Sequence, residues 1–133
     1  MRLATLSLLS LTELLIGCVP SAVKNQSVPA PPSLAELGDA SPALENYTQK
    51  YVENDLWKRP QLSPRDRSMV TVAALIARSD RVELPYHLNR AMNNGLTQSQ
   101  AEEMLTQLAF YAGWPRVFSA LPVAKKVFEA RNS

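Results

Sequence analysis

The feature that most constrains this chain is a series of helix start and stop signals that recurs from residue 41 onward. Ser41-Pro42 and Ser63-Pro64 each combine an N-cap residue with a proline at the first helical position, where the missing N–H is not needed. Residues 97–100 match a capping box, and Gly95 and Gly113 are placed to end helices. No strand-like alternation persists between these signals. The pattern therefore predicts an all-α domain.

Five helices are expected in this region. The first runs from Ser41 toward Asp55, and one of its faces carries Leu44, Tyr47 and Tyr51. The second is expected to start at Ser63-Pro64 and to include residues 70–77. The other three are expected to cover residues 82–94, 97–112 and 115–130.

The apolar residues of two of these helices predict how they are buried. Residues 70–77 are apolar on nearly all sides, which a helix tolerates only where it is buried on most sides. The last helix contains Pro122, which is expected to kink it. Its predicted buried face consists of Val117, Phe118, Leu121, Ala124 and Phe128. Since about 90 structured residues leave too little protein to bury the helix over residues 70–77 from all sides, we expect a homo-oligomer.

Composition excludes several functional classes. The net charge is only +2 and no Lys/Arg-rich run is present, so nucleic acid is not an expected partner. Cys18 is the single cysteine and His87 the single histidine, so an intramolecular disulfide or a cysteine-based metal cluster cannot form. A zinc site is likewise not expected, because His and Cys supply most zinc ligands. No metal is therefore predicted.

The N-terminal segment has the layout of an export signal. Residues 3–16 form an apolar run after Arg2 that is too short to span a bilayer as a helix. The run ends in Leu15-Ile16-Gly17-Cys18, which resembles a bacterial lipobox, in which the cysteine is lipidated and becomes the new N-terminus. We expect residues 1–18 to be a signal peptide, and the protein to reach the cell envelope or periplasm on a lipid anchor at Cys18. An ordinary cleaved signal and an attached amphipathic leader are the alternatives.

The rest of the chain divides into two parts. Residues 19–40 contain Pro20, Pro29, Pro31 and Pro32 among small and polar residues, which predicts an extended Pro-rich tether between the anchor and the domain. Residues 41–133 form the predicted helical domain.

Five short motifs in the helical domain resemble, in order, those of the carboxymuconolactone decarboxylase family. They are Leu56-Trp57-Lys58-Arg59-Pro60, Leu62-Ser63-Pro64-Arg65-Asp66-Arg67, Glu83-Leu84-Pro85-Tyr86-His87-Leu88, Asn94-Gly95-Leu96-Thr97 and Tyr111-Ala112-Gly113-Trp114-Pro115. The resemblance covers about residues 44–130. It implies a compact five-helix fold, usually assembled as trimers or hexamers, and one of two activities. One is cofactor-free decarboxylation of carboxymuconolactone, and the other is the peroxidase activity of the alkylhydroperoxidase-like branch.

The second activity depends on a Cys-x-x-Cys-x-x-x-His segment in that branch. The matching segment here carries Asp80 and Glu83 in place of the two cysteines and keeps His87. With no thiol in the domain, disulfide chemistry cannot occur. Peroxiredoxin activity is therefore an alternative that rests on family membership alone. The main expectation is a lyase that needs no cofactor.

Glu83 and His87 form the candidate acid/base pair. They are four residues apart, so on a helix their side chains are neighbours. Leu84, Leu88 and Ala91 share a face with His87, which indicates that the imidazole points toward apolar neighbours. A carboxylate one turn away is expected to raise the pKa of His87 and favour its charged form.

The resemblance to a decarboxylase suggests a role for each candidate residue. Such an enzyme holds the leaving carboxylate, stabilises dienolate-like charge and reprotonates carbon. His87 would supply the proton, and Arg67 or Arg78 would hold the carboxylates of a small-molecule substrate. The aromatic residues that would line the pocket are Trp57, Tyr111 and Trp114.

Each candidate also has a purely structural interpretation. His87 can be a hydrogen-bonded core residue, the arginines can be surface or interface ion-pair partners, and the aromatic residues can be packing. Asp80 and Glu83 also match a capping box. Three function classes follow: an acid/base enzyme acting on a small carboxylated or lactone substrate, a non-catalytic oligomeric binding protein of the cell envelope, and a peroxidase-like antioxidant protein.

Overall fold

The computed structural model describes residues 31–132, and all regular secondary structure within them is helical. The helices are α1 (Leu34–Ala40), α2 (Pro42–Tyr47), η1 (Thr48–Glu53, a π-helix), η2 (Leu56–Lys58, a 3-10 helix), α3 (Pro64–Ala77), α4 (Leu84–Asn93), α5 (Gln98–Tyr111) and α6 (Trp114–Asn132). This confirms the all-α prediction. The predicted signal peptide, Cys18 and the tether up to residue 30 lie outside the described residues. No helix of the described part is long and apolar enough to cross a membrane.

The local signals in the sequence form the predicted caps. The Ser63 hydroxyl accepts a hydrogen bond from the backbone N–H of Asp66 at 3.1 Å, with Pro64 directly behind it. Thr97 and Gln100 form both halves of a capping box at the start of α5. Gly95 follows α4 with a φ of 100°, a left-handed conformation that glycine adopts without a steric penalty. These caps place the ends of α3, α4 and α5.

Three predicted boundaries are wrong. The tether was expected to reach residue 40, but α1 begins at Leu34 because Ser33 and Glu36 form a capping box. One continuous helix was expected toward Asp55, but α2 passes into the π-helix η1 and the backbone N–H of Asn54 donates to the carbonyl of Gln49. Helix α4 also starts two residues later than predicted, because residues 80–83 form a turn before it.

The core lies between the four longest helices. Helix α3 packs on α4, and α6 packs on α3, α4 and α5. The buried apolar side chains are Val72, Leu75, Ile76, Leu84, Leu88, Ala91, Leu96, Ala101, Leu105, Ala109, Val117, Ala120, Val123, Ala124 and Phe128. Ser68 is the polar side chain among them; its hydroxyl donates to the carbonyl of Pro64 at 2.7 Å and accepts from Asn94 Nδ2 at 2.9 Å. This pair ties the start of α3 to the end of α4.

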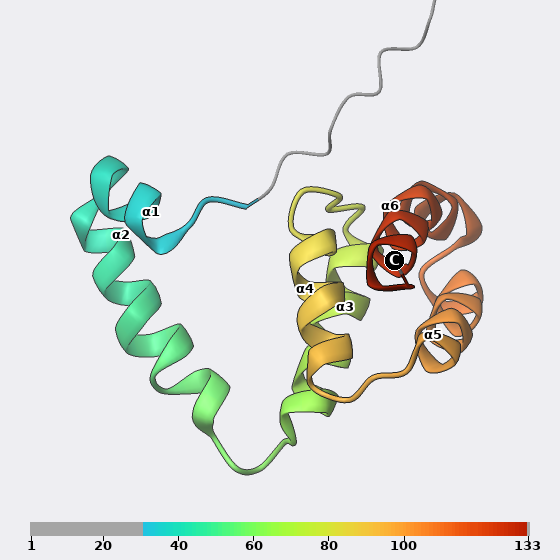
Figure 1. Ribbon diagram of the computed structural model, residues 1–133, viewed down its shortest axis with the longest axis horizontal. Helices are drawn as coiled ribbons and strands as arrows, with labels where there is room; N and C mark the ends of the chain where they lie inside the picture. Colours follow the sequence, from blue (N-terminus) through green and yellow to red (C-terminus); the bar gives the residue numbers. More distant parts are fainter. Residues whose placement is uncertain (1–30, 133) are drawn as a thin grey trace, which may run out of the picture.

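The first three helices form an arm, residues 34–53, that extends away from this four-helix body. Helix α1 packs on α2, and α2 leads into η1. Figure 1 shows the arm on one side of the molecule and α5 and α6 on the other, with α3 and α4 between them. The short helix η2 connects the far end of the arm to the loop before α3.

Some apolar side chains that were predicted to be buried are exposed in a single chain. Phe118 and Leu121 were expected to be buried, but they are 58% and 43% exposed, and Val70 of the apolar helix is 62% exposed. One copy of the described chain has no element that covers these side chains. Pro122 lies within α6, which continues past it to Asn132.

Candidate active site

The site begins at the turn between α3 and α4. Helix α3 ends in a Schellman motif: Ser79 adopts a left-handed φ of 59°, and the N–H of Asp80 donates to the carbonyl of Leu75 at 2.9 Å. Asp80 Oδ1 then accepts from the N–H of Glu83 at 3.3 Å. This turn places Glu83 at the start of α4, one helical turn before His87. The Glu83 Oε2 and His87 Nε2 atoms are 3.7 Å apart, so the predicted pair is adjacent.

Aromatic rings enclose the imidazole of His87, whose side chain is 18% exposed. Trp57 of η2 lies nearly parallel to it, with ring centroids 6.2 Å apart and an interplanar angle of 17°. Tyr86 meets it edge-on at 5.0 Å. Of the three aromatic residues predicted to line a pocket, Trp57 is the one that contacts His87.

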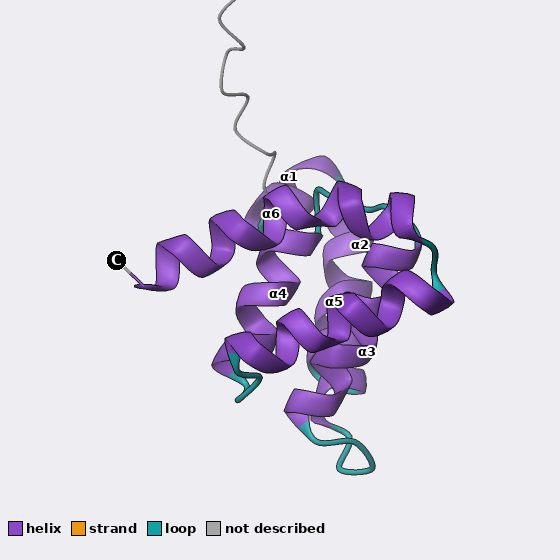
Figure 2. Cartoon of the chain, turned by 90° about the vertical axis from the view of Figure 1, so that its right-hand side faces the viewer, coloured by secondary structure: helices purple, strands orange, loops and turns teal. Residues whose placement is uncertain are grey.

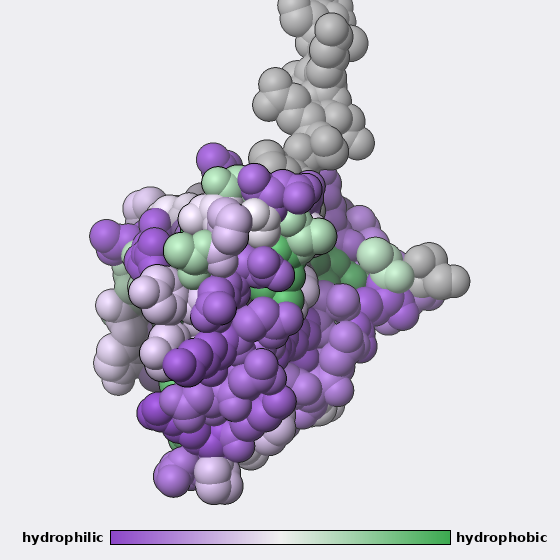
Figure 3. All heavy atoms as spheres, turned by 90° about the vertical axis from the view of Figure 1, so that its left-hand side faces the viewer, coloured by the Kyte–Doolittle hydropathy of each residue, from purple (hydrophilic) through white to green (hydrophobic). Residues whose placement is uncertain are grey.

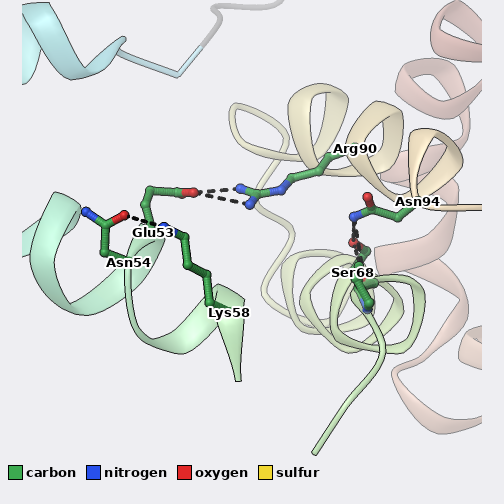
Figure 4. A network of polar contacts seen from close by, with 7 residues as sticks. Glu53, Asn54, Lys58, Ser68, Arg90 and Asn94 are labelled. Atoms are coloured by element: carbon green, nitrogen blue, oxygen red, sulfur yellow. Dashed lines mark hydrogen bonds and ion pairs between the residues drawn. The ribbon is translucent and has the colours of Figure 1, made fainter. Parts of the chain in front are cut away.

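Arg90 connects this site to the arm. Its guanidinium lies 3.6 Å from the centroid of the Trp57 ring, on α4 one turn after His87. Its two terminal nitrogens donate to the two carboxylate oxygens of Glu53, each at 3.2 Å. Figure 4 shows these two contacts bridging from η1 across to α4. The ion pair and the stacked tryptophan together hold the end of the arm over the helix that carries His87.

The electrostatics of His87 differ from the expectation based on Glu83 alone. Burial lowers the pKa of His87 below its ordinary value of 6.5, and the nearby Arg90 cation lowers it further, outweighing the opposing effects of Glu53 and Asp80. The predicted rise in the pKa of His87 is therefore wrong. Burial raises the pKa of Glu83, and the Asp80 carboxylate adds to that rise. The two pKa values are thus shifted toward each other, which suits a pair that exchanges one proton.

Two buried nitrogen atoms have no hydrogen-bond partner within residues 31–132: His87 Nδ1 and Arg67 Nε. An unpaired polar group costs free energy when it is buried, so each of these two nitrogens is a candidate contact for a polar ligand atom. Arg67 is otherwise held by its Nη2, which donates to the carbonyl of Arg59 at 2.9 Å. No hydrogen bond or ion pair joins Arg67 to His87.

The other predicted site residues lie elsewhere. The side chain of Arg78 is 75% exposed and approaches Asp80 at 3.9 Å. Tyr111, at the end of α5, is 82% exposed. Trp114 is 52% exposed and lines an apolar groove between α5 and α6. None of the three has a ring contact, hydrogen bond or ion pair with His87.

Glu53 and Arg90 were missed by the sequence analysis. Arg90 could have been identified from the sequence, because it is three residues after His87 and therefore shares its face of α4. Glu53 could not, because it is 37 residues from Arg90 and only the folded chain brings them together. The described residues contain no group of three or more His, Cys, Asp or Glu side chains arranged to hold a metal ion.

Comparison with known proteins gives consistent matches. The model of the carboxymuconolactone decarboxylase family matches residues 42–126. A 4-carboxymuconolactone decarboxylase from Acinetobacter baylyi is 34% identical over 97 residues, which cover 73% of this chain and 72% of that protein. A nitrosuccinic acid decarboxylase from Metarhizium robertsii is 34% identical over 71 residues, which cover 53% of this chain and 50% of that protein.

Proposed function

Because the chain belongs to the carboxymuconolactone decarboxylase family, we propose that it is a cofactor-free decarboxylase that acts on a small carboxylated or lactone substrate at His87. The observation that carries this proposal is the buried, unpartnered Nδ1 atom of His87, on an imidazole whose other nitrogen faces Glu83. The two relatives are named for the decarboxylation of different acids, so the type of reaction is the property they share.

The reaction requires one bond cleavage and one proton. The bond between the carboxylate carbon and its neighbour breaks, CO2 leaves, and the electron pair delocalises into a conjugated acceptor such as the lactone carbonyl. A proton is then added to the carbon that lost the carboxylate. The protein therefore has to hold the carboxylate, stabilise the transient anion and deliver the proton.

His87 is the proposed proton donor. In the free protein burial lowers the pKa of His87 and so favours the neutral imidazole. A bound anionic substrate places negative charge beside the ring and raises the pKa of His87, so the proton is taken up together with the substrate. Glu83, 3.7 Å from Nε2, stabilises the imidazolium until Nδ1 donates to carbon.

Arg67 is the proposed carboxylate ligand. Its Nε is buried and unpartnered, whereas both terminal nitrogens of Arg90 already donate to Glu53. Arg78 is less suited to this role, because its side chain is mostly in solvent.

The test is CO2 release from 4-carboxymuconolactone and, separately, from nitrosuccinic acid. We expect His87→Gln to lower kcat by about 10²–10⁴-fold, the usual contribution of a general acid, with an unchanged far-UV spectrum and melting temperature. Arg67→Gln is expected to raise KM, and Arg78→Gln is the matched control that leaves both constants unchanged.

Three results would contradict the proposal. A folded His87→Gln protein with wild-type turnover removes the acid/base role. Saturable binding of these acids without CO2 release indicates a binding protein. Peroxide consumption that persists in Cys18→Ser indicates the antioxidant alternative in a thiol-free form.

The proposal includes a place of action in the cell envelope, with the lipid anchor at Cys18. It rests on the apolar run that ends in Leu15-Ile16-Gly17-Cys18 and on the prolines that follow. Cys18→Ser is expected to leave the precursor uncleaved or to release the protein from the membrane fraction. Unchanged membrane association of this variant contradicts lipidation.

A further inference from the structure

The outward face of the arm is apolar and uncovered. Leu44, Tyr47 and Tyr51 are 50%, 60% and 51% exposed, and the two tyrosine rings stack with centroids 5.9 Å apart. Glu53 points from the same arm toward α4, so Tyr51, two residues earlier, points away from the body. Figure 3 looks onto the arm side and shows green and pale residues gathered in its upper part, above a mostly hydrophilic region.

A second uncovered apolar surface lies on the opposite side of the molecule. Helices α5 and α6, which face the viewer in Figure 2, border a groove with a volume of about 820 Å³. Its lining includes the buried Leu105, Val117 and Phe128 and the exposed Phe118 and Leu121. Exposed apolar surfaces of this kind usually mark a contact with another molecule.

The groove does not suit the proposed substrate. Its charged lining residues are Glu102, Lys125 and Glu129, and Lys125 is already paired with Glu129 at 3.7 Å. A dicarboxylic acid therefore finds more negative than positive charge there. The groove is also separate from His87, which is not among its lining residues.

The arm carries the features that fit this groove. It presents a row of one aliphatic and two aromatic side chains, and tyrosine combines a large apolar ring with a hydroxyl that can stay hydrated at a rim. The Lys50 Nζ atom lies 5.2 Å from the centroid of the Tyr51 ring, so a positive charge lies beside the aromatic row. That cation complements the carboxylates of Glu102 and Glu129 at the groove.

The arm cannot fill the groove of its own chain, because α3 and α4 lie between them (Figure 1). We infer that the arm of one copy lies in the α5–α6 groove of a second copy. Because the two surfaces differ and lie on opposite sides of the molecule, the contact is heterologous, and its repetition about a rotation axis closes a ring. The same contact fixes the arm from outside, which holds Glu53 and Trp57 over α4.

Complementation between two variants of the full-length protein tests this inference. Tyr47→Asp/Tyr51→Asp places charge on the arm and leaves the groove intact, whereas Phe118→Asp/Leu121→Asp does the reverse. We expect each variant to be monomeric by light scattering at micromolar concentration, where the wild type is oligomeric. An equimolar mixture retains one intact arm and one intact groove, so it is expected to form a heterodimer.

A matched control and a second pair of variants complete the design. Tyr111→Asp adds one negative charge at an α5 residue that is 82% exposed and does not line the groove, and it is expected to assemble as the wild type does. If circular dichroism shows that an aspartate variant is unfolded, the corresponding serine substitutions are used, with a raised dissociation constant as the expected result.

The outcomes separate the possible modes of pairing. A wild type that stays monomeric, or an arm or groove variant that assembles normally, overturns the inference. A groove variant that still assembles while the arm variant is monomeric indicates that arms pair with arms, and the reverse result indicates that grooves pair with grooves. Two monomeric variants whose mixture also stays monomeric do not form the arm–groove contact, which overturns the inference as well. Heterodimer formation in the mixture supports it.

Discussion

The ion pair between Glu53 and Arg90 has a predictable effect on the titration of His87. The Arg90 cation lowers the pKa of His87, and the Glu53 carboxylate raises it. Arg90→Met keeps an apolar stem against Trp57 and removes the charge, so it is expected to raise the pKa of His87. Glu53→Gln keeps the shape of the side chain and is expected to lower it. The two substitutions break the same contact but shift the pKa in opposite directions.

The magnitude of the ion pair follows from its geometry. Both N···O distances are 3.2 Å, longer than the 2.7–2.9 Å of strong charge-assisted hydrogen bonds, and the side chains are 23% and 33% exposed. The pair is therefore bidentate but partly hydrated, which places its coupling near the upper end of surface pairs, about 1 kcal/mol. A free energy of this size changes the ratio of folded to unfolded protein by a factor of about five.

Two assays measure these effects. His87 is the only histidine, so a single imidazole Cε1–H resonance followed by NMR against pH reports its pKa without ambiguity. Urea denaturation of the wild type, both single variants and the double variant gives the coupling free energy from a double-mutant cycle.

Two results would contradict the effects expected from the Glu53–Arg90 ion pair. If both substitutions shift the pKa of His87 in the same direction, the effect is a change of burial and not of charge. A coupling free energy near zero means that solvent screens the pair, and the arm is then held by other contacts.

Two further predictions concern stability. Ser79→Gly removes the strain of a left-handed backbone at the end of α3 and is expected to stabilise the fold by about 0.5 kcal/mol. Gly95→Ala has open space around its new Cβ and is expected to destabilise the fold by about 1 kcal/mol through backbone strain alone. Thermal melts measure both effects. The pKa of His87 in the folded state lies below 6.5. As the pH falls from 6.5 toward that lowered pKa, the unfolded chain therefore binds more protons than the folded chain, and the folded state loses stability in this window. Urea denaturation at pH 7.5 and 5.5 should show a larger loss for the wild type than for His87→Gln, and an equal loss refutes it.

Local signals predicted most of the fold. Ser63, Thr97 and Gly95 each cap a helix through atoms within three residues, so the sequence alone determines these ends. The capping box of Ser33 and Glu36 is equally local and was visible in the sequence, but the surrounding prolines favoured an extended tether.

Interactions between distant residues account for the part of the site that was not predicted. The charge of His87 depends on Arg90 and on Glu53, which lies on a different helix, whereas sequence spacing drew attention to Glu83. Tyr111 and Trp114 were selected from motif position and Arg78 from its charge, and neither property carries information on which side of the body a residue lies.

The exposed apolar residues of α6 and of the arm bear on how assembly affects the protonation of His87. Apolar periodicity predicted that Phe118 and Leu121 are buried and that Leu44, Tyr47 and Tyr51 share a face, and both patterns are present in surfaces that a single chain leaves open. The arm that carries the tyrosines also carries Glu53 and leads into Trp57, two of the groups that surround His87. If a second copy holds the arm, assembly therefore sets the position of the groups that control the protonation of His87. Dilution below the dissociation constant of the oligomer should then shift the pKa of His87 along with the oligomeric state.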